Sequence, residues 1–479
     1  MTAPRLTQQS LATLAPAIGR PSYPRGGPIG VVHLGLGAFH RAHQALVFDA
    51  LLQGGDARWG VCGVAMRSPV LKASLDAQDG LYAVQTASSA GATWQISGAI
   101  WQTCHAPTER SKVVEALAAP HTRWVTLTVT EKGYTPELAG LLVEGLAARR
   151  ARGLNGSNGL TIASCDNLTH NGDKLKALCL AAAQGDEALS AWIGTHCAFP
   201  NSMVDRIVPA ASAKTLASAE AALGATDGAA LATESFWEWV IERKFCDAAD
   251  AEVLSRAGVT VVEDVSPFEE AKLRLLNASH TAMACIGAVA GLGVISDCIG
   301  NAHIHTFIRG LMTEEVGPQM RRADWPAYRD ALLARFANPA LQHSVHQIAT
   351  DSSQKIPQRL PPSALGAMAK GLPYQRLAFA AAAWMRYLQG VNEQGTAYAL
   401  NDPMAARLQA LALSNIDDAA ATANAIGTLT EVWGSELPRH PVWLKAVTRW
   451  LGLIQQQGIL AALGQVNDEA DIPGNQARR

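Results

Sequence analysis

The feature that most constrains this chain is a change in pattern near residue 265. Before it, short apolar runs typical of buried strands alternate with helical stretches, as in a parallel sheet wrapped by helices. After it, Ala- and Leu-rich segments of helical period follow one another. A chain of 479 residues is also long for one hydrophobic core. We therefore expect an α/β domain over residues 1–265 and an all-α domain over residues 266–479.

Four runs predict buried strands of a main sheet, namely 29–34, 60–65, 124–130 and 160–164. The last two end in polar residues, where such a sheet places its ligand. Runs 81–86 and 93–101 alternate apolar and polar residues, which predicts an antiparallel pair beside the sheet. Helices of the second domain are predicted at 269–292, 302–315, 325–337, 375–390, 404–413, 417–432 and 441–463. The Pro-rich stretch 351–363 predicts a loop.

The composition is that of a soluble globular protein, with 48% apolar and 17% charged residues. A formal net charge of −2 gives no electrostatic reason to expect nucleic acid or a membrane as partner. Residues 1–20 lack a signal-peptide pattern, and the eight cysteines are scattered without a Cys-x-x-Cys pair. We therefore expect a cytoplasmic, metal-free protein that is a monomer or a small homo-oligomer.

Gly35-Leu36-Gly37 follows the first apolar run and opens a helical pattern through Leu52. Gly35 would permit a tight turn, and Gly37 would let the backbone approach a pyrophosphate. The amides of the following residues would hold that anion. They are Ala38, Phe39, His40 and Arg41, with His40 in place of the third glycine of the usual fingerprint. An ordinary turn is the alternative, but the context favours a dinucleotide-binding, Rossmann-type domain.

The same fingerprint calls for an acid after the second strand, where it binds the ribose 2′-hydroxyl of NAD. The sequence there runs from Ala65 through Arg67 to Val70 without an acid. Arg67 could face the 2′-phosphate of NADP or simply be solvated. The sequence thus leaves NAD and NADP both open.

Lys272, Asn277 and His280 lie at the start of the long 269–292 segment. At about 100° per residue they fall at about 0°, 140° and 80°, within one broad arc of a helix. Oxidation of an alcohol needs a base for its proton and donors for the developing oxyanion. Lysine, asparagine and histidine supply these groups without metal, although a solvated helix face is the alternative.

Other polar residues stand where predicted elements end. Asn167 follows the strand at 160–164, where a ligand-facing group is expected. Its alternative is a turn-forming Asp-Asn pair. Two further clusters are Thr130 with Glu131, and Asp205 with Arg206. For these, helix caps or ion pairs are the alternative.

Several strings together resemble the mannitol dehydrogenase family of long-chain polyol dehydrogenases, which includes fructuronate reductase (mannonate oxidoreductase). They are VVHLGLGAFHRAHQAL (31–46), LTVTEKGY (127–134), SCDN (164–167), FPNSMVDRIVPA (199–210), PFEEAKLRLLNASH (267–280), RFANPALQH (335–343), DSSQKIPQRL (351–360) and AAWMRYLQGV (382–391). They extend over most of the chain.

The resemblance implies a Rossmann-type domain, a helical domain and an NAD(P)-dependent dehydrogenase whose active site draws on both. Lys272 would be the general base. Asn167 and Asn277 would hold the reacting oxygen, and His280 would position the substrate. The nicotinamide would contact Asp205. NAD is the expected cofactor, with NADP not excluded.

Two departures from the family are visible. NAD-preferring relatives carry acids where Pro69 and Val70 stand. The segment between Tyr134 and Leu154 is shorter than in many relatives. The first departure again leaves the choice of dinucleotide open, and the second suggests a more open site.

The substrate class depends on the stretch around residues 351–360, which looks closest to fructuronate reductase. Lys355 and Arg359 would place two cations near the site, with Arg206 as a third substrate-binding candidate. Because arginine offers a planar fork to a carboxylate, we expect a linear sugar acid. The alternatives are a mannitol- or arabinitol-type polyol 2-dehydrogenase and, less favoured, a catalytically silent nucleotide-binding sensor.

Overall fold

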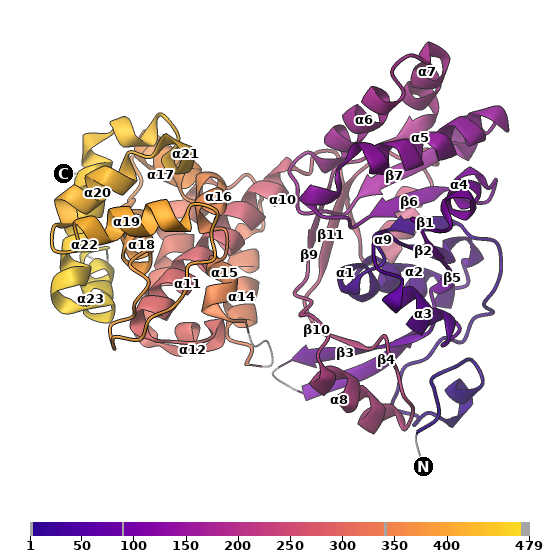
Figure 1. The fold of residues 1–479 in the computed structure, drawn as a ribbon, viewed down its shortest axis with the longest axis horizontal. Helices are drawn as coiled ribbons and strands as arrows, with labels where there is room; N and C mark the ends of the chain where they lie inside the picture. The colour runs from indigo at the N-terminus through magenta and orange to yellow at the C-terminus, as the bar shows by residue number, and fades with distance from the viewer. Residues whose placement is uncertain (1–2, 89–90, 340–342, 471–479) are drawn as a thin grey trace. The chain divides into compact units, whose positions relative to one another are not determined.

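The computed structural model describes residues 3–88, 91–339 and 343–470 (Figure 1). It divides into two compact units, Met1–Ser266 and Pro267–Arg479. None of the described helices is both long and apolar enough to span a bilayer.

A six-stranded parallel sheet forms the centre of the first unit, in the order β5-β2-β1-β6-β7-β8. Its strands are β1 (Val31–Leu34), β2 (Val61–Ala65), β5 (Ile100–His105), β6 (Trp124–Leu127), β7 (Leu160–Ser164) and β8 (Cys197–Ala198). Each of the four predicted main-sheet runs contains one of these strands. The chain proceeds outward from β1 in both directions, so β1 and β6 meet at the switch point where such sheets bind ligands.

Two layers of helices cover this sheet, because successive strand residues point to opposite faces. Val31 packs into one core and the next residue, Val32, into the other. The Val31 core is completed by α2 (Gln44–Gln53), α3 (Val70–Asp76) and α9 (Asp250–Arg256). The Val32 core is completed by α4 (Arg110–Ala118), α5 (Pro136–Ala151), α6 (Asn171–Ala182) and α7 (Glu187–His196) (Figure 1).

The predicted antiparallel pair beside the sheet is confirmed, although its boundaries differ. β3 (Tyr82–Ser88) pairs antiparallel with β4 (Gly91–Ser97), and β10 (Leu231–Glu234) joins β3 in parallel. The run at 93–101 therefore contains the end of this hairpin and the start of β5 in the main sheet. A third sheet of β9 (Ser202–Asp205), β11 (Glu238–Glu242) and β12 (Thr260–Val262) was not expected.

The helix after the glycine turn is shorter than the sequence pattern predicts. α1 covers only Ala38–Ala42, and α2 begins after a break at His43, where φ is −125° and ψ is −94°. The expectation of one continuous helical stretch through Leu52 is wrong here. A five-residue helix adds little macrodipole to the turn, so any anion there depends on individual amides.

In the described part of the second unit every named element is a helix, as predicted. Its helices are α10 (Ser266–Ala271, starting at the boundary), α11 (Ala278–Ala290), α12 (Ile295–Gly300), α13 (Ala302–Gly310), α14 (Trp325–Phe336), α15 (Val345–Ala349), α16 (Ser352–Arg359), α17 (Pro361–Lys370), α18 (Gln375–Tyr387), α19 (Ala405–Ser414), α20 (Ala419–Gly427), α21 (Thr430–Trp433), α22 (Pro441–Gln457) and α23 (Ile459–Ala470). α18 is buried along most of its length and packs against α11 and α22.

The loop predicted at 351–363 is wrong, because this stretch forms α16 and the start of α17. Asp402 accepts hydrogen bonds from the backbone N–H of Ser353 at 2.7 Å and from the Ser353 hydroxyl at 2.6 Å. Ile356 is completely buried. These tertiary contacts outweigh the loss of helix stability that Pro357 causes inside α16. Pro361 occupies the first position of α17, where proline is favourable.

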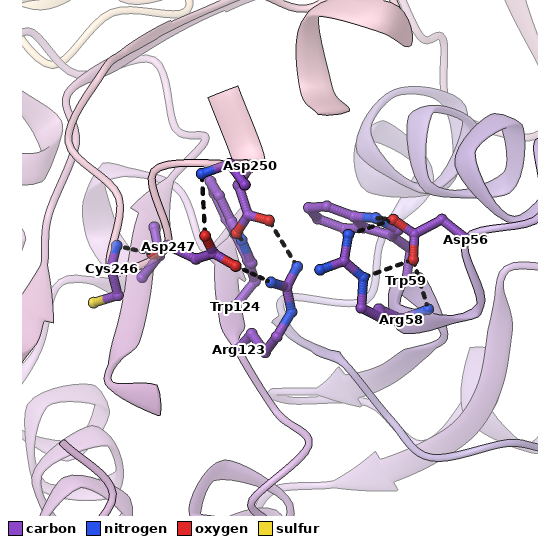
Figure 2. A network of polar contacts seen from close by, with 10 residues as sticks. Asp56, Arg58, Trp59, Arg123, Trp124, Cys246, Asp247 and Asp250 are labelled. Carbon is purple, nitrogen blue, oxygen red and sulfur yellow. Dashed lines mark hydrogen bonds and ion pairs between the residues drawn. The ribbon is translucent and has the colours of Figure 1, made fainter. Parts of the chain in front are cut away.

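At the amino ends of the strands, a polar network fastens the sheet to α9 (Figure 2). Arg123 Nη2 lies 2.9 Å from Asp250 Oδ1, and Trp124 Nε1 donates to Asp250 Oδ2 at 2.7 Å. Asp250 is 1% exposed. Asp247 accepts from the same guanidinium at 3.2 Å. This network lies at the opposite ends of the strands from the glycine turn, so we assign it to stability.

Candidate functional site

The glycine turn between β1 and α1 requires a residue without a side chain. Gly35 has a φ of 104°, and a Cβ there would lie 2.3 Å from the carbonyl oxygen of Thr128. Gly37 has an ordinary conformation, and its Cβ would meet only the Gly35 carbonyl oxygen at 3.5 Å. Gly35 is therefore needed to fold the turn, whereas Gly37 leaves its outer face open.

A cavity of about 910 Å³ opens at the carboxyl ends of β1, β2 and β6. The glycine turn, the residues after β2 and the loop after β6 line it, notably Gly35, Gly37, Arg67, Ser68, Thr130 and Lys132. This is the position at which Rossmann-type sheets hold a dinucleotide. The open face at Gly37 and the cavity beside it fit such a cofactor.

Two stacked imidazoles support the turn from below. The ring of His40 lies 3.3 Å from that of His33 on β1, at an interplanar angle of 10°. His33 Nε2 lies 2.9 Å from Thr128 Oγ1 and 3.2 Å from the Gly35 carbonyl oxygen. Burial lowers the pKa of His33 to about 3 and that of His40 well below its usual value, so both rings are neutral.

The side chains that follow the turn also face the protein interior. Arg41 is buried, donates to the carbonyl oxygens of Gly37 (3.2 Å) and Ala229, and lies 5.2 Å from the Tyr82 ring centre. Phe39 stacks on His43 at 5.0 Å. For Phe39, His40 and Arg41, any cofactor contact would therefore come from the backbone, as predicted for the amides.

Asp166 holds the loop that follows β6. Its carboxylate accepts from the backbone N–H of Thr130 at 2.7 Å and of Val129 at 3.2 Å, and from the Tyr134 hydroxyl at 3.2 Å. Thr130 has a φ of 66°, a conformation that these bonds stabilise. Burial raises the pKa of Asp166 to about 6. Sequence reasoning missed Asp166, although it lies within the SCDN string.

The other predicted residues of the first unit differ in their surroundings. Asn167 is exposed directly after Asp166, and Asp205 is buried at the end of β9. Thr130 lines the cavity, whereas Glu131 is not among its lining residues. The guanidinium of Arg206 donates to the carbonyl oxygen of Glu234 at 2.8 Å and to that of Ala42, which leaves few donors for a substrate.

In the second unit, Lys272–Asn277 form a π-helical turn between α10 and α11. The N–H of Ala278 donates to the carbonyl oxygen of Leu273, five residues earlier. The angular positions that a regular α-helix would give Lys272, Asn277 and His280 are therefore wrong here. In a π turn, residues five apart lie about one turn apart, so Lys272 and Asn277 share a face more closely than predicted.

Cationic and imidazole side chains surround His280. Its ring lies 4.6 Å from that of Phe336 and 5.7 Å from that of His343. Its Nε2 is buried without a hydrogen-bond partner among the described residues. Burial lowers the pKa of His280, and His343, Arg335, Arg359 and Lys355 lower it further. The imidazole is therefore neutral.

α16 supplies the two cations that the sequence predicted. Arg359 Nη1 donates to the Asn277 carbonyl oxygen at 3.1 Å and to Thr281 Oγ1 at 2.6 Å. Lys355 Nζ donates to the Ile348 carbonyl oxygen at 3.2 Å. Burial lowers the pKa of Arg359 to about 10 and that of Lys355 below its usual value. Arg359 thus also holds the end of the π turn.

Arg335 and His343 are further members of this group that the residue analysis missed. Both stand in the string RFANPALQH, which carried part of the family resemblance but was given no function. Residues 340–342 of that string lie outside the described residues. Among those described, no three His, Cys, Asp or Glu side chains are grouped so as to hold a metal ion.

The chain matches two family models over most of its length. Residues 29–253 match the Mannitol dehydrogenase Rossmann domain, and residues 264–454 match the Mannitol dehydrogenase C-terminal domain. D-mannonate oxidoreductase of Escherichia coli (strain K12) is 37% identical, over 87% of this chain and 91% of that protein. Mannitol 2-dehydrogenase of Phaeosphaeria nodorum is 38% identical, over 82% of this chain and 75% of that protein.

A solved structure shows the same fold. Pseudomonas fluorescens mannitol 2-dehydrogenase, in a ternary complex with NAD and D-mannitol, aligns with a TM-score of 0.81 and 31% identity. The alignment covers 97% of this chain and 100% of that one. The recognised motifs, the parallel sheet with its glycine turn and these matches agree. The chain belongs to the mannitol dehydrogenase family and is an oxidoreductase with a Rossmann domain and a helical C-terminal domain.

Proposed function

We propose that this enzyme interconverts a secondary alcohol and a ketone on a linear sugar acid, of the mannonate and fructuronate type, with NAD as cofactor. The first unit would bind the dinucleotide and contribute Asn167, and the second would supply the base and the other substrate contacts. The bound dinucleotide would accept or donate the hydride. NAD is supported by the cavity at the glycine turn and by the related enzyme that was solved with NAD.

The protein residues would handle the proton and the oxygen. Lys272 would take the hydroxyl proton through Nζ as the alcohol is oxidised. Asn167 and Asn277 would donate to the oxygen on which negative charge develops. His280, held neutral, would offer its buried Nε2 to a substrate hydroxyl. Thr130, Asp205 and the amides after Gly37 would position the cofactor.

The observation that favours a sugar acid is the concentration of positive charge around His280. Arg335, Lys355 and Arg359 all act on its pKa. Asp351 and Asp402 are the carboxylates that act on Lys355, and Asp402 is already bound by Ser352 and Ser353. A substrate carboxylate would complement this charge.

A second observation favours a neutral polyol instead. One nitrogen of Arg359 is already bonded to Asn277 and Thr281, so the guanidinium has a structural task without any carboxylate. A relative at 38% identity is a mannitol 2-dehydrogenase. In this case, Lys355 and Arg359 would bind hydroxyl groups.

Steady-state kinetics with fructuronate and fructose as ketones, and mannonate and mannitol as alcohols, would decide between the two. We expect kcat/KM to be higher for the acids. Lys355→Met should lower it at least about tenfold more on the acids than on the polyols, since a charge-assisted contact is lost. Lys355 is the cleaner probe, because Arg359→Met would also release Asn277.

Lys370→Met is the control, because Lys370 is an exposed lysine at the end of α17. This variant should leave kcat/KM unchanged on both the acids and the polyols. The polyol alternative would be established by either of two results. One is an equal loss of kcat/KM on acid and polyol in Lys355→Met, and the other is a native enzyme that prefers mannitol.

A further inference from the structure

We propose that the residues after β2 form a 2′-phosphate subsite, with Arg67 and Ser68 as its donors, so that the enzyme uses NADP(H) as well as NAD(H). This inference rests on the proposed dehydrogenase function and specifies its cofactor. In sites selective for NAD, an acid at this position binds the ribose 2′-hydroxyl and repels a phosphate. Here no acid follows β2, and Arg67 brings a positive charge to the same stretch.

The backbone of Arg67 is anchored while its side chain is exposed. His105, the last residue of β5, places Nε2 2.8 Å from the Arg67 carbonyl oxygen. Its Nδ1 lies 2.9 Å from Thr108 Oγ1, which fixes the ring. Within the described residues, the guanidinium of Arg67 has neither an ion-pair nor a hydrogen-bond partner. A fork of donors is therefore available at the rim of the cavity.

The hydroxyl of Ser68 is the second donor. Its oxygen accepts from the Val70 backbone N–H at 3.3 Å, which leaves the hydroxyl hydrogen free to be donated outward. Ser68 is exposed and, like Arg67, lines the same cavity as Gly35 and Gly37. One ligand could thus contact the glycine turn and both donors.

The charges around this rim also favour an anion. Among the described residues, Arg67, Arg110 and Lys132 line the cavity, against a single lining carboxylate, Glu137. Arg110 is paired with Glu144 at 2.7 Å.

Another carboxylate near the rim, Glu109, is already neutralised. It lies 2.8 Å from the ammonium of Lys112 and 3.6 Å from that of Lys72, and it accepts the His105 N–H at 2.9 Å. A 2′-phosphate would therefore meet net positive charge.

Fluorescence titration with NADH and NADPH tests the subsite without any sugar substrate. We expect the native protein to bind the two with dissociation constants within about tenfold of each other. Arg67→Gln should weaken NADPH at least about tenfold more than NADH, because only the 2′-phosphate loses a charge-assisted contact. Ser68→Asp, which places an acid after β2, should weaken NADPH binding relative to NADH binding by a still larger factor. The NADPH affinity should also fall more steeply with salt.

The matched control is Arg150→Gln, which removes a half-exposed arginine on α5 that faces Asp186 at 3.6 Å. It should change neither affinity. Native binding of NADPH more than about a thousandfold weaker than NADH, or equal losses of both in Arg67→Gln, would overturn the subsite. If NADH itself does not bind, the proposed function fails. If NADH binds and turns over but NADPH does not bind, only this inference fails.

Discussion

The two units present their functional groups in different ways. In the first unit, the cavity is shaped by backbone: a glycine turn, a loop held by Asp166, and buried side chains such as His33 and Arg41 that support the turn from behind. In the second unit, the candidate groups are side chains on helices, and the π turn sets their spacing. Binding of a common cofactor requires a shaped backbone, whereas proton transfer requires individual side chains.

The units also differ in the electrostatics of their sites. Beneath the glycine turn, burial keeps His33 and His40 neutral, and it raises the pKa of Asp166. Around His280, by contrast, the cations Arg359 and Lys355 remain close to each other despite burial. A neutral support suits a site that binds its ligand through amides. A concentration of cations suits a site that binds an anion.

The largest expected effect tests whether chemistry resides in the second unit. Lys272→Ala should lower kcat at least about a thousandfold, about 4 kcal/mol, because the proton acceptor is lost. NADH affinity should change little, since the glycine-turn cavity belongs to the first unit. Stopped-flow turnover and NADH titration measure the two effects. Near-native turnover would exclude Lys272 as the base.

The second prediction concerns pH and the first unit. The pKa of Asp166 is about 6 in the folded chain, against 3.8 as its ordinary value. Its contribution to stability is therefore greatest below pH 3.8 and is lost as the pH rises through about 6. Relative to Asp166→Asn, the native protein should lose on the order of 3 kcal/mol of unfolding free energy between pH 4 and pH 7.

Urea unfolding at several pH values measures this difference. Glu187→Gln, which removes an exposed carboxyl on α7 but keeps Asp166, is the control and should lose stability with rising pH as the native protein does. Parallel curves for native protein and Asp166→Asn would mean that Asp166 keeps its ordinary pKa.

The third prediction separates folding from binding within the glycine turn. Gly35→Ala should destabilise the first unit by at least about 2 kcal/mol, because its φ of 104° and the nearby Thr128 carbonyl exclude a Cβ. Gly37→Ala should leave the melting temperature unchanged but weaken NADH about tenfold, because its Cβ would occupy the open face. Calorimetry and titration distinguish the two. Unchanged NADH affinity in Gly37→Ala would place the pyrophosphate elsewhere.

The smallest expected effect concerns the opposite ends of the strands. Asp250→Asn should lower stability by about 1.5 kcal/mol, since the buried carboxylate loses its charge-assisted bond with Arg123. Asp247→Asn, at the more exposed partner, should cost less than about 1 kcal/mol. Neither should alter kcat or KM, because the network lies at the amino ends of the strands and the glycine turn lies at their carboxyl ends. A kinetic effect would contradict its purely structural role.

Local patterns in the sequence were sufficient for much of the fold. The apolar run before Gly35 predicted β1, and the equivalent runs predicted β2, β6 and β7. The stretch at 351–363 was misread, because Pro357 and Pro361 indicated a loop while the contacts that stabilise α16 come from Asp402, far along the chain. The prolines can be read from the local sequence. The tertiary contacts that offset their helix-breaking effect cannot be read there.

The candidate site shows the same division. Lys272, Asn277, His280 and Asn167 could be selected from the sequence because motif spacing and residue type are local properties. The π turn that aligns Lys272 with Asn277, and the bond from Arg359 that holds its end, could not be predicted, because a helix tolerates an inserted residue only when its neighbours stabilise it.

By itself, then, the sequence determined the class of both domains and the glycine turn, and it selected the candidate reactive side chains, since these depend on periodicity and on residue chemistry. The tertiary structure decided which of these groups face inward. His40 and Arg41 became supports of the turn rather than side-chain ligands, and Asp166 became the anchor of the cavity loop. The physical reason is that burial and hydrogen-bond partners arise from segments distant in sequence, such as β1, β6 and β7, that meet only in the folded sheet.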